Sequence, residues 1–135
     1  MKTALKVLFI VILCSMLYVT TWASLQCPLF GVPRPVATHP WFLATLADAY
    51  WGFVTFWVWV AYKQTTWSAR LSWLVAVIGL GNLAMSLYWL SELFTEPKDA
   101  PLAQLFTARR SGPGTLGIIL AVLGIGITIL GAVSA

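Results

Sequence analysis

Four long apolar runs, separated by short polar connections, dominate the pattern of the chain. They cover residues 7–24, 41–62, 71–94 and 113–134. Each run is close to the length of about 20 residues that a helix needs to cross a bilayer core. All seven prolines lie between these runs or at their edges, where a missing N–H group does no damage to a helix interior. The pattern predicts an all-α, polytopic membrane protein, with four transmembrane helices in an up-down bundle that forms one domain over residues 1–135.

Composition agrees with this pattern and excludes other classes of protein. Of the 135 residues, 60% are hydrophobic and only 9% are charged, which excludes a water-soluble monomer and intrinsic disorder. Two cysteines allow at most one bridge, so the chain is not a disulfide scaffold. The net charge of +4 comes from basic residues scattered at the ends of the apolar runs rather than gathered in a patch, which argues against nucleic-acid binding.

The basic residues give only a weak indication of orientation. With four spans, four of them fall on each side of the membrane: Lys2, Lys6, Lys63 and Arg70 on one, and Arg34, Lys98, Arg109 and Arg110 on the other. We expect both termini on the cytoplasmic side of a bacterial inner membrane, because two of these lysines flank the first helix, which usually dominates orientation. Residues 102–110 form either an interfacial amphipathic segment or a solvated loop. The first run also has the length and charge of a signal peptide, although we favour its retention.

Asp48 is the only charged residue well inside a predicted span. Because a charge facing lipid is costly, this carboxylate needs a partner or a proton. It shares a helix face with Gly52, a small residue that allows close helix packing. We expect an intramembrane polar cluster of Asp48 with Asn82 and Ser86, which lie four residues apart on the third run. Such a cluster either fixes the helix register or supplies a functional acid.

Other candidate residues have both a packing and a functional interpretation. Gly117, Gly124 and Gly131 belong to a stripe of small residues on the fourth run, which packs either against the other helices or against another chain. Trp51 lies near mid-span and either packs or faces a ligand. His39, the only histidine, either caps the second helix or lies at the interface, and an axial contact to a porphyrin-type pigment stays open.

No catalytic residue or metal ligand is assigned, and no cofactor is implied. The chain lacks a Cys-x-x-Cys pair, a phosphate-binding Gly-rich loop with its lysine, and a nucleophile elbow. We therefore expect no enzyme, but an accessory or assembly subunit of a membrane complex. The alternative is a transporter or a membrane protein that binds a small ligand or pigment through Asp48 and Asn82. The expected partners are the lipid bilayer and either other membrane-protein subunits or further copies of the chain.

Several short segments carry a resemblance to a known family. They are Trp22-Ala23-Ser24, Pro40-Trp41, Ala44-Thr45-Leu46-Ala47-Asp48-Ala49-Tyr50-Trp51-Gly52-Phe53, Trp59-Val60-Ala61-Tyr62-Lys63 and Gly81-Asn82-Leu83-Ala84-Met85-Ser86. Together they resemble a domain of unknown function found in small integral-membrane proteins of bacteria and plants. The resemblance covers about residues 1–95 and leaves the fourth run outside. It implies a helical membrane protein and brings no activity, substrate or site residues with it.

Overall fold

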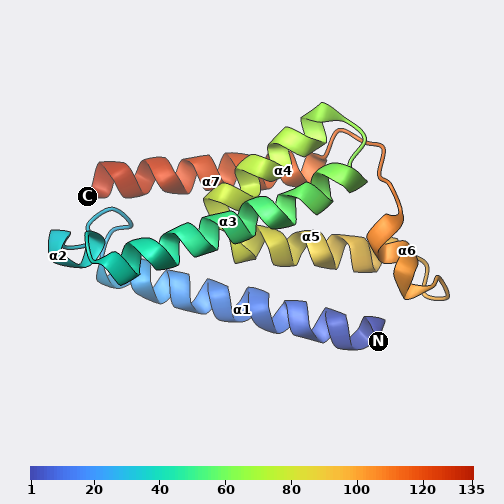
Figure 1. Ribbon diagram of the computed structural model, residues 1–135, viewed down its shortest axis with the longest axis horizontal. Helices are drawn as coiled ribbons and strands as arrows, with labels where there is room; N and C mark the ends of the chain where they lie inside the picture. Colours follow the sequence, from blue (N-terminus) through green and yellow to red (C-terminus); the bar gives the residue numbers. More distant parts are fainter.

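Three long helices run along the length of the molecule (Figure 1). They are α1 (Lys2–Gln26), α3 (Pro40–Lys63) and α7 (Thr115–Ser134), in a computed structural model that describes residues 1–135. Each is long and apolar enough to cross a membrane. No strand is present, so the all-α class is confirmed, as are the helices expected over residues 7–24, 41–62 and 113–134.

The third apolar run is broken into two short helices, α4 (Trp67–Leu80) and α5 (Asn82–Thr95). Each has 14 residues. At 1.5 Å per residue such a helix is about 21 Å long, too short for a hydrocarbon core of about 30 Å. The prediction of one helix over residues 71–94, and with it the prediction of four spanning helices, is therefore wrong.

Gly81 causes the break. Its backbone has φ 54° and ψ −126°, a conformation that a residue with a side chain strongly avoids. The ladder of α4 ends where the Gly81 N–H donates to the Val77 carbonyl at 2.8 Å, and that of α5 opens where the Met85 N–H donates to the Gly81 carbonyl at 3.1 Å. The Phe53 ring of α3 fills the space beside Gly81, 2.9 Å from where a Cβ would lie. The chain therefore turns sharply at this residue.

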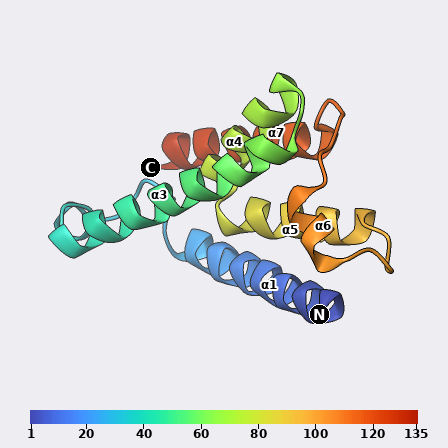
Figure 2. The ribbon, with the colours of Figure 1, turned by 45° about the vertical axis from the view of Figure 1, so that its right-hand side comes forward.

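The two short helices form a hairpin that enters the bundle and returns to the same end (Figures 1 and 2). Its tip lies half-way along the long helices, because Gly79 next to the tip meets Gly124 near the middle of α7. Leu80 at the tip likewise shares an apolar cavity with Leu13, near the middle of α1. The N- and C-termini lie at opposite ends of the molecule, which differs from the expected placement of both on one side (Figure 1).

The hairpin also redistributes the basic residues. Seven of the eight now lie at the end that holds the N-terminus, through contacts among the helix ends and loops there: Lys2, Lys6, Lys63, Arg70, Lys98, Arg109 and Arg110. Only Arg34, the first residue of the short α2 (Arg34–Ala37), lies at the other end (Figure 1). The expected tie of four basic residues on each side is therefore wrong, because it followed from four spans.

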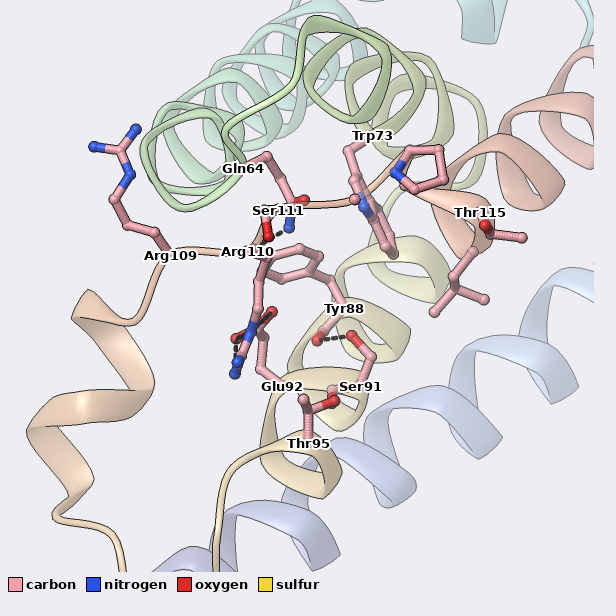
Figure 3. Close-up of a pocket in the computed structure, with 14 residues that line it drawn as sticks. Gln64, Trp73, Tyr88, Ser91, Glu92, Thr95, Arg109, Arg110, Ser111 and Thr115 are labelled. Atoms are coloured by element: carbon pink, nitrogen blue, oxygen red, sulfur yellow. Dashed lines mark hydrogen bonds and ion pairs between the residues drawn. The ribbon is translucent and has the colours of Figure 1, made fainter.

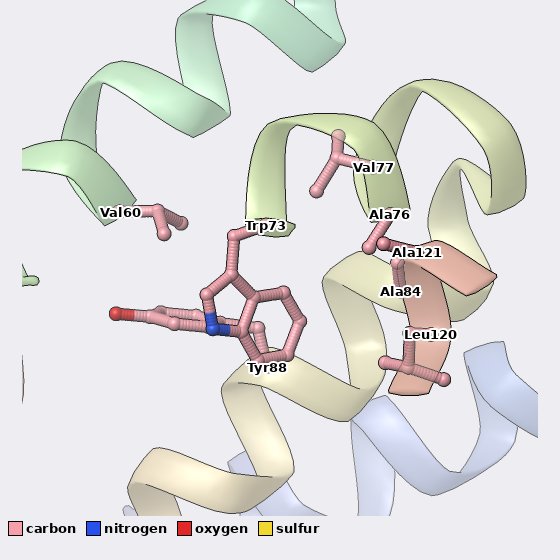
Figure 4. Close-up of a cluster of buried hydrophobic side chains, with 8 residues drawn as sticks. All are labelled: Val60, Trp73, Ala76, Val77, Ala84, Tyr88, Leu120 and Ala121. Atoms are coloured by element: carbon pink, nitrogen blue, oxygen red, sulfur yellow. The ribbon is translucent and has the colours of Figure 1, made fainter. Parts of the chain in front are cut away.

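The core lies where the hairpin packs between the long helices (Figure 4). Helix α4 lies on α7, α5 lies on α1, and α3 packs mainly on α4. The buried cluster consists of Val60, Trp73, Ala76, Val77, Ala84, Tyr88, Leu120 and Ala121. The stripe of small residues on α7 faces into this packing: a Cβ at Gly117 would lie 2.9 Å from the Trp73 indole, and one at Gly124 would lie 3.3 Å from Gly79. Further along the helix, Gly131 lies against Leu29.

Two smaller features complete the fold. His39 caps α3, because its Nδ1 accepts a hydrogen bond from the Trp41 N–H at 3.3 Å. Within the segment 102–110, α6 (Leu102–Thr107) is a short helix that buries Leu105 completely. The ring of Phe106 packs on Trp59 and lies 5.9 Å from it between centroids. The segment is therefore docked on the helix ends rather than being a freely solvated loop.

Candidate functional site

Four charged residues gather at the end of the molecule that holds the N-terminus. Lys63 is the last residue of α3, Glu92 lies in the last turn of α5, Glu96 directly follows α5, and Arg110 lies in the loop before α7. Lys63, Glu92 and Glu96 are 0%, 3% and 6% exposed. Two positive and two negative charges balance one another, so the cluster is neutral as a whole.

Glu92 is at the centre of this ion cluster. Its Oε2 accepts hydrogen bonds from Lys63 Nζ and, at 3.0 Å, from Arg110 Nη2. Its Oε1 accepts from Arg110 Nε at 3.3 Å. Arg110 Nη2 also donates to Glu96 Oε1 at 2.5 Å, and Lys63 Nζ donates to the Leu105 carbonyl. The cluster thus joins the ends of α3 and α5 to α6 and to the loop before α7.

A short stretch of backbone pairing places Arg110 in this cluster. Its N–H donates to the Lys63 carbonyl at 2.7 Å, and its carbonyl accepts from the Thr65 N–H at 3.0 Å. Burial acts to lower the pKa of Arg110, but the hydrogen bonds and charges of Glu92 and Glu96 outweigh it, and the pKa is raised above the ordinary value. Arg110 is therefore a permanent cation that holds both carboxylates.

A cavity of about 480 Å³ lies beside the ion cluster (Figure 3). Its wall is mostly polar and comes from the α3–α4 turn, α5 and the loop that leads into α7: Gln64, Trp73, Tyr88, Ser91, Glu92, Thr95, Arg109, Arg110, Ser111, Gly112, Pro113, Gly114, Thr115 and Leu116. The Arg109 side chain points away from the cavity in Figure 3 and lies over the Tyr62 ring, 5.1 Å from its centroid. Arg110 is therefore the cation that faces the cavity from the cluster.

Tyr88, Trp73 and Gln64 form the deep part of the cavity. The Tyr88 hydroxyl accepts a hydrogen bond from Gln64 Nε2 at 3.2 Å. The rings of Trp73 and Tyr88 are nearly perpendicular, with centroids 4.7 Å apart, and both residues are almost fully buried. No group of three or more His, Cys, Asp or Glu side chains lies close enough to hold a metal ion. The arrangement is suited to binding a polar ligand.

A family model for a protein of unknown function, DUF1475, matches residues 4–135. The chain belongs to the DUF1475 family. The resemblance to a domain of unknown function is therefore confirmed, but its expected limit near residue 95 is wrong, because the DUF1475 match continues through α7. The whole ion cluster and the cavity beside it lie within the DUF1475 match. No curated protein and no solved structure matches the chain.

In this DUF1475 chain the three residues of the expected polar cluster are not joined. Asp48 is exposed on α3, Asn82 is exposed at the hairpin tip, and Ser86 is buried in α5. No hydrogen bond or ion pair within the chain involves the Asp48 side chain; the ion pairs are confined to the cluster around Glu92. The break at Gly81 removes the antiparallel pair of full-length helices on which the expected cluster depended.

The surroundings of Asp48 are also open. Nothing lies within 4 Å of a Cβ built on Gly52, and Trp51 is 70% exposed. The N-terminal half of α3, which we define as Pro40–Gly52, thus carries a polar face that no other part of the chain covers. It stays a prediction that Asp48 or Trp51 binds a ligand, or that Gly52 packs against another helix.

Sequence reasoning missed the ion cluster, although one signal was present. Glu92 and Glu96 are two of only four acidic residues, and they lie four residues apart on one helix face at the end of an apolar run. Two carboxylates at such a boundary need cations nearby. With four spans Lys63 falls on the opposite side of the membrane, which concealed its partnership with Glu92.

Proposed function

We propose that this protein is a non-enzymatic accessory or assembly subunit that binds another integral membrane protein through the N-terminal half of α3. The observation that carries the proposal is Asp48, an exposed carboxylate within a helix that is long and apolar enough to cross a membrane. The partner we propose is a transmembrane helix with a basic or hydrogen-bond-donating side chain at the depth of Asp48.

The depth of Asp48 makes exposure to lipid costly. It lies eight residues after Pro40, the first residue of α3, or about 12 Å along the helix. An acid at such depth costs roughly 2–3 kcal/mol on insertion scales, and intramembrane acids almost always face a protein interior or water. A partner helix that donates a hydrogen bond to the carboxylate removes this cost. Small residues on the same face, Ala44 and Gly52, allow that helix to approach closely.

The α7 stripe is no longer the best surface for a partner. Gly117 and Gly124 lie against α4 within the chain, so they cannot also receive a second protein. Exposed apolar side chains are normal on a protein that faces lipid and do not identify a docking surface. An exposed carboxylate does, because lipid cannot satisfy it.

The distribution of basic residues supports a proposal for orientation. Seven of the eight lie at the end that holds the N-terminus. Basic residues near short connections are retained on the cytoplasmic side. We therefore propose that this end faces the cytoplasm, in a bacterial inner membrane, and that the C-terminus lies on the other side.

Copurification tests the proposal. The full chain is purified in mild detergent as wild type, as Asp48→Leu and as Asp99→Asn, a control that removes an exposed acid outside the spans. We expect wild type and Asp99→Asn to capture the same protein at fixed stoichiometry, and Asp48→Leu to lose it. Asp48→Leu should still fold, because it removes a charge from an apolar depth. Equal capture by all three variants, or a wild-type chain that purifies alone, contradicts the proposal.

A second candidate is transport of a proton or a small polar solute, and the hairpin tip favours it. The helical hydrogen-bond ladder is interrupted at Gly81, about half-way through the bundle, and interrupted helices are typical of solute sites in transporters. Flux through liposomes that depends on the protein and is abolished by Asp48→Asn favours this candidate. Partner capture without flux favours the first.

A further inference from the structure

We infer that the cavity beside the ion cluster is a binding site for a phosphate group. This site lies at the end of the molecule opposite to Asp48 and does not depend on the subunit role proposed above. Unpartnered hydrogen-bond donors, the start of α7 and the balance of charge each support it.

The deep wall of the cavity has donors without acceptors. Trp73 is 3% exposed and Tyr88 is 1% exposed. The Tyr88 hydroxyl accepts a hydrogen bond from Gln64, but it donates none, and Trp73 Nε1 also donates none. The only side-chain polar atom that is sealed from solvent without a partner is Glu96 Oε2. Trp73 lines the cavity, and its indole N–H has no acceptor in the chain and is not sealed from solvent (Figure 3).

The first turn of α7 supplies further donors to the same cavity. The helix has 20 residues, and its first backbone bond runs from the Ile118 N–H to the Gly114 carbonyl at 2.9 Å. The N–H groups of Thr115, Leu116 and Gly117 therefore have no intrahelical acceptor, and no side chain caps this helix. Thr115 and Leu116 line the cavity. A helix start of this kind attracts anions through its N–H groups and its dipole.

The position of this helix start is fixed by close packing. Gly114 has φ 73° and lies so close to α4 that a Cβ on it would be 2.6 Å from the Ala69 Cα. The Ser68 hydroxyl donates to the Pro113 carbonyl at 3.0 Å, and the Thr66 hydroxyl donates to the Gly112 carbonyl at 2.6 Å. The donors at the start of α7 are therefore held in place before any ligand arrives.

The cavity offers unpartnered N–H groups and a carboxylate that is already paired, and these features indicate the class of ligand. Glu92 Oε2 already accepts hydrogen bonds from Lys63 and Arg110, and Glu92 Oε1 accepts one from Arg110, so this carboxylate is paired before any ligand binds. The ion cluster of Lys63, Glu92, Glu96 and Arg110 is neutral, and Arg109, whose side chain points away from the cavity (Figure 3), brings the local charge to +1. The unpartnered N–H groups and this small positive charge favour an anionic ligand that is rich in acceptors.

A phosphate group has these properties. Its oxygens point in several directions, as the donors of Trp73, Tyr88 and α7 require, whereas a carboxylate offers two oxygens in one plane. The volume of about 480 Å³ leaves room for the group that carries the phosphate. The phosphate belongs either to a lipid headgroup or to a soluble molecule.

The test uses the full chain in detergent with three probes: inorganic phosphate, dioleoyl phosphatidic acid and dioleoylglycerol. The last two have the same acyl chains and differ in the phosphate. Binding is measured by calorimetry and by the midpoint of thermal unfolding, which a ligand of the folded state raises in a saturable manner. We expect phosphatidic acid or inorganic phosphate to bind and dioleoylglycerol not to bind. A response to phosphatidic acid alone identifies a lipid headgroup, and a response to inorganic phosphate alone identifies a soluble ligand.

Two variants locate the binding. Thr115→Asp puts a carboxylate at the start of α7, which suits the helix but repels an anion, so Kd should rise at least about tenfold. Trp73→Phe replaces the indole with a smaller aromatic ring that lacks the N–H, and should weaken binding by a smaller factor. Thr107→Asp, at an exposed position at the same end outside the cavity, is the control and should bind as wild type does. The inference is overturned if neither phosphate probe binds, or if Thr115→Asp and Thr107→Asp bind with equal affinity.

Discussion

The substitution Gly81→Ala tests the feature on which the rest of the architecture depends, the turn of the α4–α5 hairpin. Gly81 has φ 54° and ψ −126°, and a Cβ on it would lie 2.9 Å from Phe53 Cζ. Alanine at this position therefore meets two separate penalties: a backbone conformation that a side chain disfavours, and a ring that must move.

The size of the effect follows from these two contributions. A residue forced into such a backbone region costs about 1–3 kcal/mol. Added volume in a packed site costs about 1–3 kcal/mol, at the lower end here because the atom that must move is the far end of one ring. We expect Gly81→Ala to lower the free energy of unfolding by about 2–4 kcal/mol, out of roughly 5–15 kcal/mol for a typical protein. Phe53→Leu in the same chain should recover the packing part and leave the strain.

The assay is denaturation of the full chain in detergent, followed by tryptophan fluorescence, for which the chain has eight reporters. The control is Gly52→Ala on α3, next to Phe53, where nothing lies within 4 Å of the new Cβ. That variant should be as stable as wild type, or more stable by up to about 1 kcal/mol, because alanine favours a helix. If Gly81→Ala is as stable as Gly52→Ala, the chain does not turn at Gly81 and our account of the hairpin is refuted.

Two further predictions test the topology and the ion cluster. In a chain whose native cysteines are replaced, Thr65→Cys and Asp99→Cys should react with an impermeant thiol reagent from the same side of the membrane; labelling from opposite sides means that the third run crosses it. Lys63→Met leaves Glu92 buried with one cation fewer and should lower the free energy of unfolding by about 3–5 kcal/mol in denaturation. Arg109→Met, which removes an exposed cation, should cost under about 1 kcal/mol, and equal losses would show that Lys63 is not buried.

The long helices could be predicted from the sequence, and the hairpin could not. The length of the apolar runs and the positions of proline were sufficient to predict α1, α3 and α7, because both signals are local to one segment of the chain. A single glycine in an apolar run is compatible with a continuous helix. Tertiary contacts favour the turn at Gly81: the Phe53 ring lies beside it, and Gly79 approaches Gly124 on a helix more than forty residues away.

The ion cluster could not be predicted either, because it depends on the same turn at Gly81. Four spans place Glu92 and Arg110 on one side of the membrane and Lys63 on the other, about 30 Å away across the hydrocarbon core. Because the hairpin enters and leaves the bundle at the same end, Lys63 lies beside Glu92, and every charge in the cluster has a partner. One backbone conformation thus decides both the distribution of basic residues and the burial of the acids.

The two halves of the molecule differ in how completely the chain fills them. At the end that holds the N-terminus, the hairpin occupies the space among α1, α3 and α7, and its ion pairs are satisfied internally (Figure 2). Beyond the tip at Gly81 no fourth helix continues, and the long helices make few contacts with one another. Asp48 lies in this second half, exposed, on the face that a continuous third helix was expected to cover. Asp48 is therefore uncovered because no helix continues beyond the hairpin tip, and a helix from a partner subunit would fill that space and cover the carboxylate.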